Sequence, residues 1–323
     1  MEYRNVGRSG LKVSSIGLGS WLTYAGYAEE SARACIERAY DLGITFFDTA
    51  NVYHHGAAEA VVGRVLGAYP RDSYVLATKV FFPMGDKPTQ RGLSRKHIMD
   101  QCHASLRRLG TDYIDLYQTH RYDPQTPVEE TLRALDDLIR QGKILYAGVS
   151  EWSPSQIRTA LDLADRRGFD RIISNQPIYN MFVRYIEAEI LPLCRQEGIG
   201  QVVFSPLGQG VLSGKYRSAD DLPAGARATR TDANQWVRSY LVPEVLEATR
   251  VLEGIAAEHG WSLPQLALAW VLRDPAVASA ITGASRPEQV TQNAAAAEIR
   301  LDEATLEAVE KALAPTAGVP IAW

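Results

Sequence analysis

Short apolar runs alternate with longer amphipathic runs along almost the whole chain. The short runs have the length of buried β-strands, and the longer runs repeat apolar residues every three or four positions, as helices with one buried face do. Eight strands are predicted: Ser15–Gly19, Thr45–Ala50, Tyr74–Val80, Ile114–His120, Leu145–Ser150, Arg171–Gln176, Gln201–Pro206 and Val277–Gly283. Helices are predicted over Glu29–Leu42, Ala57–Ala68, Ser94–Leu109, Val128–Gln141, Ser153–Arg167, Ile186–Glu197, Pro243–Arg273 (as two helices) and Arg286–Ala297.

Local sequence signals mark the ends of several of these helices. Ser153 followed by Pro154 is typical of a capping residue with proline at the first helical position. Gly110, Gly142 and Gly168 each follow a helical run, where a left-handed cap at the carboxyl end favours glycine. The capping signals therefore agree with the periodicity.

The order of these elements predicts the fold. Because every strand leads into a helix, we expect parallel pairing with right-handed crossovers. Closing such a sheet gives an α/β fold, the (β/α)8 TIM barrel, whose usual size suits a single domain over residues 1–323. A doubly wound sheet is the main alternative, but its glycine-rich turn would need a third glycine where Leu22 follows Gly17 and Gly19.

Two further segments lie outside the eight strand–helix units. Tyr3–Val13, with Gly7 and Gly10 at its turn, predicts a short N-terminal β-hairpin, which we expect to close the barrel floor. The amphipathic run Asp302–Ala314 predicts an extra C-terminal helix beyond the eighth unit.

Composition excludes several classes of partner. With 34 Lys and Arg residues against 38 Asp and Glu residues, the net charge is −4, which gives no reason to expect nucleic acid or an anionic membrane surface. The N-terminus has no apolar signal core, and no stretch approaches the roughly 20 apolar residues that span a bilayer. Three widely spaced cysteines do not form a disulfide framework. We therefore expect a cytoplasmic protein.

Four polar residues fall at the ends of predicted strands or just after them. Asp48, Lys79 and His120 end the second, third and fourth strands, and Tyr53 follows Asp48 in its loop. The active sites of (β/α)8 barrels lie at the carboxyl ends of the strands, so we expect these residues to meet at one rim. Any one of them could simply face solvent, but a half-buried Asp and Lys pair is costly to desolvate and favours a chemical role.

This set of residues suits proton transfer to a carbonyl oxygen. A tyrosine with its usual pKa near ~10 is a weak acid, and we expect the ammonium of Lys79 to lower the pKa of Tyr53. Asp48 would hold Lys79, and His120 would hydrogen-bond the substrate oxygen and orient it. None of these side chains supplies reducing equivalents, so a hydride donor is required.

Longer motifs extend over nearly the whole chain. They are G-L-G-S-W (17–21), D-T-A-N-V-Y-H-H-G-A-A-E (48–59), A-T-K (77–79), G-L-S-R-K-H-I (92–98), D-Y-I-D-L-Y-Q-T-H (112–120), S-N-Q (174–176), F-S-P-L-G-Q-G-V-L-S-G-K-Y (204–216) and G-A-S-R-P-E-Q-V-T-Q-N (283–293). With these motifs the sequence resembles the aldo-keto reductase superfamily, and within it the branch of voltage-gated potassium channel β subunits and related bacterial reductases.

The resemblance implies a catalytic tetrad and a cofactor. Asp48, Tyr53, Lys79 and His120 would be the tetrad, with Tyr53 the general acid in carbonyl reduction. Channel-associated members often lack the histidine, so its presence favours a competent reductase. The implied cofactor is NADPH, held by residues that match the family motifs: Ser20, Trp21, Asp48, Ser150, Gln176, Phe204, Ser205, Leu207, Gly208, Lys215, Arg227, Gly283, Ser285, Arg286, Gln289, Gln292 and Asn293.

Each part of this set has an expected partner on the cofactor. Position-matching puts Ser20 and Trp21 near the nicotinamide end, Ser150 and Gln176 at its carboxamide and Phe204 against its face. Ser205, Leu207 and Gly208 lead toward the pyrophosphate, and Lys215 and Arg227 would contact phosphates. Gly283, Ser285 and Arg286 open a helix whose positive end suits an anion, and the Arg286 guanidinium suits a 2′-phosphate. Gln289, Gln292 and Asn293 would face the adenine.

The substrate pocket is expected to be apolar, with loop aromatic residues along the same rim. Its predicted lining comprises Trp21, Tyr53, His54, Phe81, His120 and Trp152. Adjacent histidines point in different directions, so His54 and His55 are interpreted as pocket wall and no metal is expected.

Two functions remain open at this point. One is NADPH-dependent reduction of a small-molecule aldehyde or ketone, which the complete tetrad favours. The alternative is a regulatory subunit that binds NADP(H) and signals its redox state to a partner protein, because fold alone does not fix function. Related proteins also suggest that the chain forms a homo-oligomer.

Overall fold

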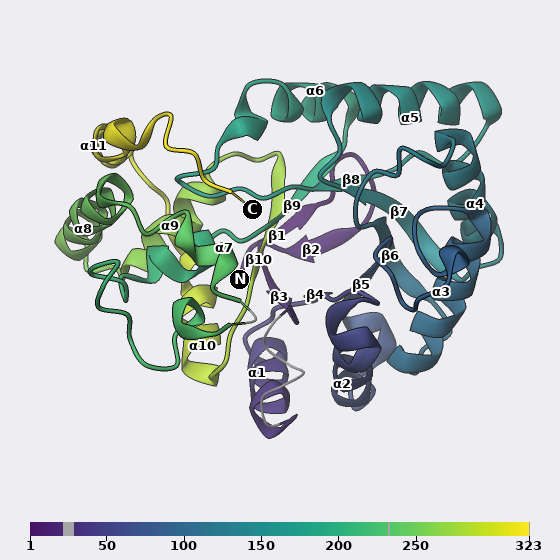
Figure 1. Cartoon of the computed structure of the whole chain (residues 1–323), viewed down its shortest axis with the longest axis horizontal. Helices are drawn as coiled ribbons and strands as arrows, with labels where there is room; N and C mark the ends of the chain where they lie inside the picture. Colours follow the sequence, from purple (N-terminus) through teal and green to yellow (C-terminus); the bar gives the residue numbers. More distant parts are fainter. Residues whose placement is uncertain (22–28, 232, 323) are drawn as a thin grey trace.

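Eight parallel strands form a closed barrel in the computed structural model, which describes residues 1–21, 29–231 and 233–322 (Figure 1). Their order around the barrel is β10-β3-β4-β5-β6-β7-β8-β9. The strands are β3 (Ile16–Gly19), β4 (Phe46–Asp48), β5 (Val75–Val80), β6 (Ile114–Thr119), β7 (Ile144–Ser150), β8 (Ser174–Gln176), β9 (Gly200–Phe204) and β10 (Val277–Thr282). The predicted (β/α)8 TIM barrel and all eight predicted strands are confirmed.

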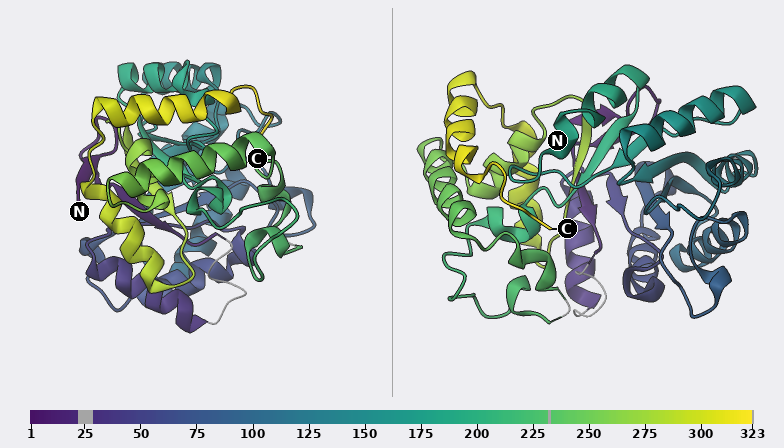
Figure 2. Two further views of the ribbon diagram at one scale, coloured as in Figure 1. Left: turned by 90° about the vertical axis from the view of Figure 1, so that its left-hand side faces the viewer. Right: turned by 45° about the horizontal axis from the view of Figure 1, so that its top comes forward.

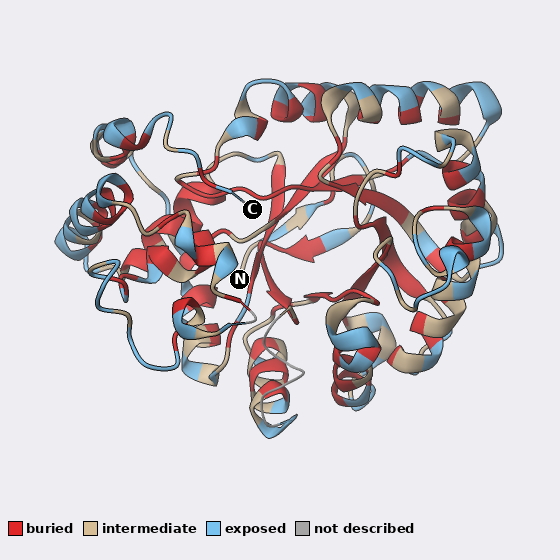
Figure 3. Cartoon of the chain, viewed as in Figure 1, coloured by how far each residue is buried: buried red, intermediate tan, exposed pale blue. Residues whose placement is uncertain are grey.

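Helices surround the barrel, with buried residues toward the strands and exposed residues outward (Figure 3). They are α1 (Glu29–Asp41), α2 (Ala57–Leu66), α3 (Arg95–Leu109), α4 (Val128–Arg140), α5 (Pro154–Arg167), α6 (Ile190–Glu197), α7 (Gln235–Arg238), α8 (Pro243–Glu258), α9 (Leu263–Val271), α10 (Pro287–Ala295) and α11 (Glu303–Leu313). The predicted extra C-terminal helix is α11, which packs beside α8 outside the ring (Figure 2).

Capping explains where several helices begin and end. Ser153 accepts a hydrogen bond from the amide of Gln156 and forms a capping box at the start of α5. Gly110 and Gly168 end α3 and α5 in the left-handed conformation, each with φ of 66°. The predicted helix from Ile186 starts later, since a 3-10 turn over Tyr185–Glu187 precedes α6.

The N-terminal hairpin closes one end of the barrel. Its strands β1 (Tyr3–Asn5) and β2 (Lys12–Ser14) pair antiparallel. Val6 and Val13 are fully buried and belong to an apolar cluster formed with inward residues of several barrel strands. The turn leaves no room for a side chain at Gly7, where a Cβ atom would lie 2.0 Å from a backbone oxygen. The hairpin therefore plugs the floor, as the sequence predicts.

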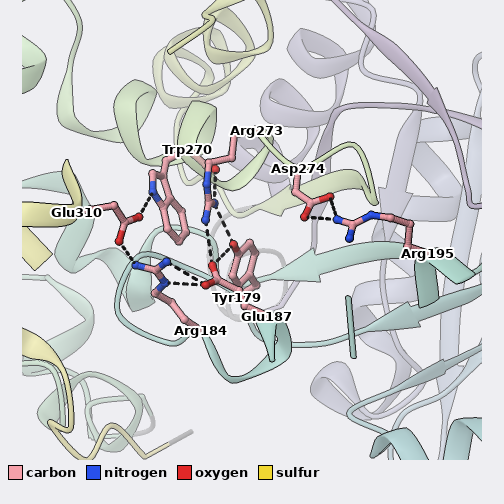
Figure 4. A network of polar contacts seen from close by, with 8 residues as sticks. All are labelled: Tyr179, Arg184, Glu187, Arg195, Trp270, Arg273, Asp274 and Glu310. Carbon is pink, nitrogen blue, oxygen red and sulfur yellow. Dashed lines mark hydrogen bonds and ion pairs between the residues drawn. The ribbon is translucent and has the colours of Figure 1, made fainter. Parts of the chain in front are cut away.

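An ionic network joins the segment after β8 to α9 and α11 (Figure 4). The Glu187 carboxylate accepts hydrogen bonds from Tyr179 at 2.6 Å, Arg273 at 3.0 Å and Arg184 at 2.9 Å. Arg184 also pairs with Glu310 of α11 at 2.6 Å. These partners hold the pKa of Glu187 below its usual value against the opposing effect of burial, so the network keeps its charge at neutral pH.

No helix in the described parts of the chain combines the length and the apolar character needed to cross a bilayer. Cys35, Cys102 and Cys194 are buried free thiols.

Candidate active site

The four residues predicted as a tetrad meet at the carboxyl rim of the barrel. Asp48 is the last residue of β4, Lys79 lies in β5, His120 follows β6, and Tyr53 begins a 3-10 turn after β4. The Lys79 ammonium forms an ion pair with Asp48 and lies 3.4 Å from the Tyr53 hydroxyl. The rings of Tyr53 and His120 stand edge to face with their centroids 5.6 Å apart.

Burial and hydrogen bonds fix the Asp48 and Lys79 pair. The Lys79 side chain is fully buried and that of Asp48 is 4% exposed. Lys79 also donates to the backbone oxygen of Thr49 at 2.8 Å. The second carboxylate oxygen of Asp48 accepts from the amides of Gln176 at 3.0 Å and Gln118 at 3.4 Å. A buried ion pair with these additional partners has its remaining polar atoms satisfied.

Lys79 remains an ammonium in this environment. Burial by itself lowers the pKa of Lys79, but the Asp48 charge and hydrogen bond outweigh burial and hold that pKa above its usual value. The protonated amine lies between a carboxylate and a phenol, so it can donate to both.

The expected lowering of the Tyr53 pKa is wrong for this structure. Burial raises the pKa of Tyr53 above its usual value, because the phenolate would lose its hydration. Lys79 acts in the opposite direction, but the charge of Asp48 offsets part of its effect. Tyr53 is therefore a neutral phenol at neutral pH and carries a proton that it can give away.

His120 is a neutral imidazole. Burial, followed by the charges of Lys79 and Arg121, lowers the pKa of His120 well below its usual value. The ring of Phe82 stands edge to face with it at 4.9 Å between centroids. Its Nδ1 atom is buried without a hydrogen-bond partner in the described residues. The ring is thus fixed by packing and keeps hydrogen-bonding capacity for another group.

The turn that carries Tyr53 has an unusual backbone. His54 and His55 both adopt the left-handed conformation, with φ of 47° and 51°, which is costly for residues other than glycine. Both side chains are exposed. The turn ends at Gly56 with φ of 92°, where a Cβ would lie 2.5 Å from the Arg108 side chain. No group of three or more metal-binding side chains was found in the described parts of the chain.

Two residues predicted near the nicotinamide lie at the end of β3. The Ser20 amide donates to the backbone oxygen of Asp48 at 3.0 Å, and its hydroxyl donates to Thr49 at 2.8 Å. Trp21 stands edge to face with Trp236 at 5.7 Å between centroids. Ser20 is therefore directly beside the tetrad, whereas Trp21 reaches toward the segment after β9.

Residues at the ends of β7 and β8 are hydrogen-bonded to each other and to the tetrad. The Ser150 hydroxyl donates to the backbone oxygen of Gln176 at 2.7 Å, and the Gln176 side chain donates to Asp48. Both residues are buried. Phe204 ends the next strand, β9, and is half-buried. Of the two predicted carboxamide partners, Gln176 contacts the tetrad directly and Ser150 is linked to it through Gln176.

A tight turn follows β9 and contains several predicted phosphate contacts. Ser205, Gly208, Gln209 and Gly210 all have positive φ, between 53° and 96°. The Gln209 side chain accepts a hydrogen bond from Arg227. Partial desolvation and the charge of Arg227 lower the pKa of Lys215. Leu207 packs against the main core. Two cations therefore lie close to a compact turn, which continues as a 3-10 helix over Gly208–Ser213.

The remaining predicted cofactor residues lie at the start of α10. Gly283 and Arg286 are exposed, and Arg286 occupies the position that precedes the helix. The Gln289 side chain turns back and accepts from the amide of Ser285 at 2.8 Å and from its hydroxyl at 3.2 Å. One turn further on, Gln292 is exposed and Asn293 is buried.

The prediction that Trp152 lines the substrate pocket is wrong. Its side chain is 1% exposed and packs edge to face against Tyr122, at 5.0 Å between centroids, within the main core. A loop position does not distinguish an aromatic side chain that points outward from one that folds back. Phe81 is half-buried, and its neighbour Phe82 is the aromatic residue in contact with His120.

The sequence interpretation missed several residues of this site. They are Thr49, Gln118, Arg121 and Trp236. Gln118 lies two residues before His120, and strand periodicity of two places both side chains on the same face of the chain. That spacing could have found Gln118. Trp236 lies in α7, which no periodic pattern marks.

Comparisons with known proteins agree with this architecture. The Aldo/keto reductase family matches residues 15–314. A relative named "Putative voltage-gated potassium channel subunit beta" from Schizosaccharomyces pombe is 43% identical over 320 residues, covering 96% of this chain and 92% of the relative. Proteins named "Probable voltage-gated potassium channel subunit beta" are 41% identical in Arabidopsis thaliana (93% and 92% covered) and 40% identical in Oryza sativa subsp. japonica (96% and 95% covered).

The fold and the match define a (β/α)8-barrel oxidoreductase. The chain belongs to the aldo/keto reductase family, and it is similar to proteins named as potassium channel β subunits.

Proposed function

We propose that the protein reduces aldehydes or ketones to alcohols with NADPH, and that Tyr53 is the general acid. The observation that supports this most directly is the buried ammonium of Lys79 between the Asp48 carboxylate and the Tyr53 hydroxyl. Membership of the family makes the chain an oxidoreductase, and these contacts supply a reason for the proton-transfer part of the reaction.

The side chains around the rim fit an extended dinucleotide. Gly208 and Gly210 adopt left-handed conformations in the turn beside Lys215 and Arg227, so two cationic side chains lie next to a turn that has no bulky side chain at these two positions. The start of α10 adds Arg286 and a helix N-terminus, both of which favour an anion. These residues would hold NADPH, with Arg286 toward the 2′-phosphate, and the bound cofactor would supply the hydride.

Proton delivery follows from the contacts within the tetrad. Tyr53 donates its hydroxyl proton to the carbonyl oxygen as negative charge develops there. Lys79, 3.4 Å from that hydroxyl, stabilises the phenolate that remains. Asp48 keeps Lys79 charged and fixes its direction, with Gln176 and Gln118 holding the far side of the carboxylate.

His120 positions the substrate. As a neutral imidazole it can donate one N–H group to the carbonyl oxygen without competing with Tyr53 as a charged acid. Phe82 packs edge to face against the His120 ring. We propose that Trp21, His54, Phe81 and Phe82 form the rim of an apolar substrate pocket, which excludes water from the reacting carbonyl.

The proposed site draws on both halves of the chain. Its acid lies within residues 48–120 and its cofactor contacts reach residues 204–293, so we propose that residues 1–323 act as one domain. We place the protein in the cytoplasm as a small-molecule enzyme that forms a homo-oligomer.

The direct test is to follow NADPH absorbance with purified protein across a panel of aldehydes, ketones and keto-sugars. At least one carbonyl compound should accelerate NADPH consumption well above the rate without substrate. Absence of turnover across the panel, with NADPH bound, would contradict the proposed enzyme.

Bound NADPH without turnover of any carbonyl compound would favour the other candidate function, a regulatory subunit. Relatives named as potassium channel β subunits make it reasonable that the chain binds NADP(H) and reports its redox state to a partner protein. Slow cofactor exchange without carbonyl turnover would support a regulatory subunit. Fast exchange with turnover supports the free enzyme.

A further inference from the structure

A buried ion pair lies behind the turn that carries Tyr53, on the outer side of the barrel wall. Glu59, in the first turn of α2, has a fully buried side chain, and its carboxylate accepts a hydrogen bond from Nε of Arg108 in α3 at 2.6 Å. The Arg108 side chain is 24% exposed, so the pair opens to solvent only through the arginine. Removing one partner of such a pair leaves a buried charge uncompensated, so the two side chains depend on each other.

The same carboxylate reaches the strand that carries Lys79. Its other oxygen accepts a hydrogen bond from the buried hydroxyl of Thr78 in β5 at 2.6 Å. Because side chains alternate along a strand, Thr78 faces α2 outside the barrel while the next residue, Lys79, faces the tetrad inside. Glu59 therefore fixes the start of α2 against β5, directly beside the ammonium of the site.

Arg108 also supports the turn itself. A Cβ atom at Gly56 would lie 2.5 Å from Cδ of Arg108 and 2.6 Å from its Nε, so the arginine fills the space that any other residue would need for its side chain. His54, His55 and Gly56 all have positive φ. A strained backbone of this kind persists where the surrounding structure holds it, and Arg108 is packed against its last residue.

The helix α3 contacts the turn a second time. Its Gln101 accepts a hydrogen bond from the Asn51 side chain at 3.0 Å, and the Asn51 amide donates to the backbone oxygen of Lys79 at 3.2 Å. Asn51 precedes Tyr53 by two residues and Gly56 follows it by three. The contacts from α3 therefore hold the turn on both sides of the proposed acid.

We propose that Arg108 and Glu59 are positioning residues, which hold the Tyr53 hydroxyl at its place beside the Lys79 ammonium. The inference rests on the proposed function, in which Tyr53 is the acid, and it adds two residues that act from outside the barrel. The hydroxyl and the ammonium are 3.4 Å apart, at the long end of hydrogen-bond distances, so a further displacement of the turn removes their contact. Such a displacement lowers turnover while every residue of the tetrad is still present.

The test removes the arginine and then supplies its head group. Arg108→Ala should lower kcat for carbonyl reduction about 10-fold to 100-fold per NADPH-binding site, the loss that a displacement of about 1 Å causes. The Kd of NADPH should change less than about twofold, because the variant leaves the proposed cofactor contacts intact. Guanidinium chloride at low millimolar concentration should restore much of the lost kcat, since the vacated space opens to solvent. Urea has the same shape without the charge and should not restore it.

Two further variants make the result specific. Arg107→Ala is the matched control, because Arg107 is the preceding residue of α3 and is exposed, and it should leave kcat unchanged. Arg108→Lys keeps a cation opposite Glu59 and serves where Arg108→Ala does not fold. It should also lower kcat per NADPH-binding site, because an ammonium lacks the planar fork of the guanidinium. A merely structural role would reduce the number of NADPH-binding sites and leave kcat per site unchanged.

A second readout separates this inference from the proposed function. Carbon NMR of the full chain labelled at the tyrosine rings follows the phenol of Tyr53, whose signal Tyr53→Phe identifies. That signal should shift in Arg108→Ala, return with guanidinium and stay in place in Arg107→Ala, whether or not a carbonyl compound is reduced. The inference is overturned if the Tyr53 signal does not move, or if kcat per NADPH-binding site is unchanged in a protein that turns over. Absence of turnover in the unmodified protein contradicts the proposed function, and the Tyr53 signal then decides the positioning role by itself.

Discussion

Lys79 is the residue on which the chemistry of the rim depends. Its ammonium is fully buried, and the Asp48 charge keeps it protonated despite the loss of hydration. The ion pair with Asp48 also limits how far Lys79 lowers the pKa of Tyr53, because a cation paired with a carboxylate lowers the pKa of a phenol less than an unpaired cation does. Lys79 therefore acts on Tyr53 by stabilising the phenolate formed in the reaction, with the resting phenol left protonated.

Replacing the proposed acid should separate binding from turnover. Tyr53→Phe removes the proton donor and keeps the ring, so we expect carbonyl reduction to fall by about 100-fold or more. NADPH affinity should change less than about twofold, which a fluorescence titration measures, because the hydroxyl is a proton donor and no proposed cofactor contact. Retention of most of the turnover would rule out Tyr53 as the acid.

The pKa directions of the two rings predict the pH dependence of reduction. The active form needs Tyr53 protonated and His120 neutral. A raised pKa keeps Tyr53 protonated at least up to its usual value near ~10, and a lowered pKa keeps His120 neutral below its usual ~6.5. We expect kcat for carbonyl reduction to be nearly constant from about pH 6 to about pH 9.

Initial rates at saturating NADPH and substrate check this profile. A fall in kcat below about pH 6.5 that His120→Asn abolishes would contradict a neutral, buried His120. A fall between about pH 7 and pH 9 would indicate that Tyr53 ionises early, as the sequence alone led us to expect.

These residues show how far a sequence predicts a site. Asp48, Lys79 and His120 could be found because strand ends in a barrel share one rim, and that follows from the order of elements. The pKa shift of Tyr53 could not be predicted from the sequence, because its direction depends on the balance between burial and two opposed charges. The same limit applies to Trp152, whose burial depends on the path of a loop.

At the scale of elements, the start of α10 joins two features that favour an anion. The helix N-terminus is the positive end of the helix dipole, and Arg286 stands immediately before it with its side chain exposed. Gln289 already satisfies the amide of Ser285 from within the helix, which orders the turn without neutralising the arginine.

Removing this arginine should change cofactor preference. We expect Arg286→Ala to weaken NADPH binding about tenfold or more, the loss of a charge-assisted contact to the 2′-phosphate, and to change NADH binding less than about twofold. Fluorescence titrations with both dinucleotides measure the ratio. Equal losses for NADPH and NADH would contradict a 2′-phosphate role.

Regular elements were easier to predict than irregular ones. Buried strands and amphipathic helices carry a period in the sequence, and caps such as Ser153 mark their ends. The four-residue helix α7 and the 3-10 turns are too short to show a period, and tertiary packing determines them. The contact between Trp236 and Trp21 therefore could not be predicted, because Trp236 lies in a helix that no sequence pattern indicates.

At the scale of the whole molecule, the C-terminal tail packs against the segment after β9, which carries the proposed phosphate contacts Lys215 and Arg227. Ile321 is 9% exposed and belongs to an apolar cluster with Tyr216, Val237 and Tyr240, which follow β9. The Ser239 hydroxyl donates to the backbone oxygen of residue 322 at 3.1 Å. The C-terminal tail thus packs on this segment from outside, far in sequence from the tetrad and without contact to it among the described residues.

Loosening the tail should change cofactor exchange and leave the chemistry alone. Ile321→Ala removes apolar contacts from a small cluster, which lowers the free energy needed to open the segment after β9 locally. We expect NADPH to dissociate about threefold to tenfold faster in stopped-flow displacement, since each 1.4 kcal/mol of lost local stability corresponds to tenfold in the open population. The single-turnover rate of carbonyl reduction should remain that of the unmodified protein, because the tetrad keeps its contacts in the barrel.

Val251→Ala, an aliphatic truncation at a residue that is 45% exposed, is the matched control and should alter neither rate. Unchanged dissociation in Ile321→Ala would show that the segment opens independently of the tail, and a slower single turnover would show that the tail also supports the catalytic rim.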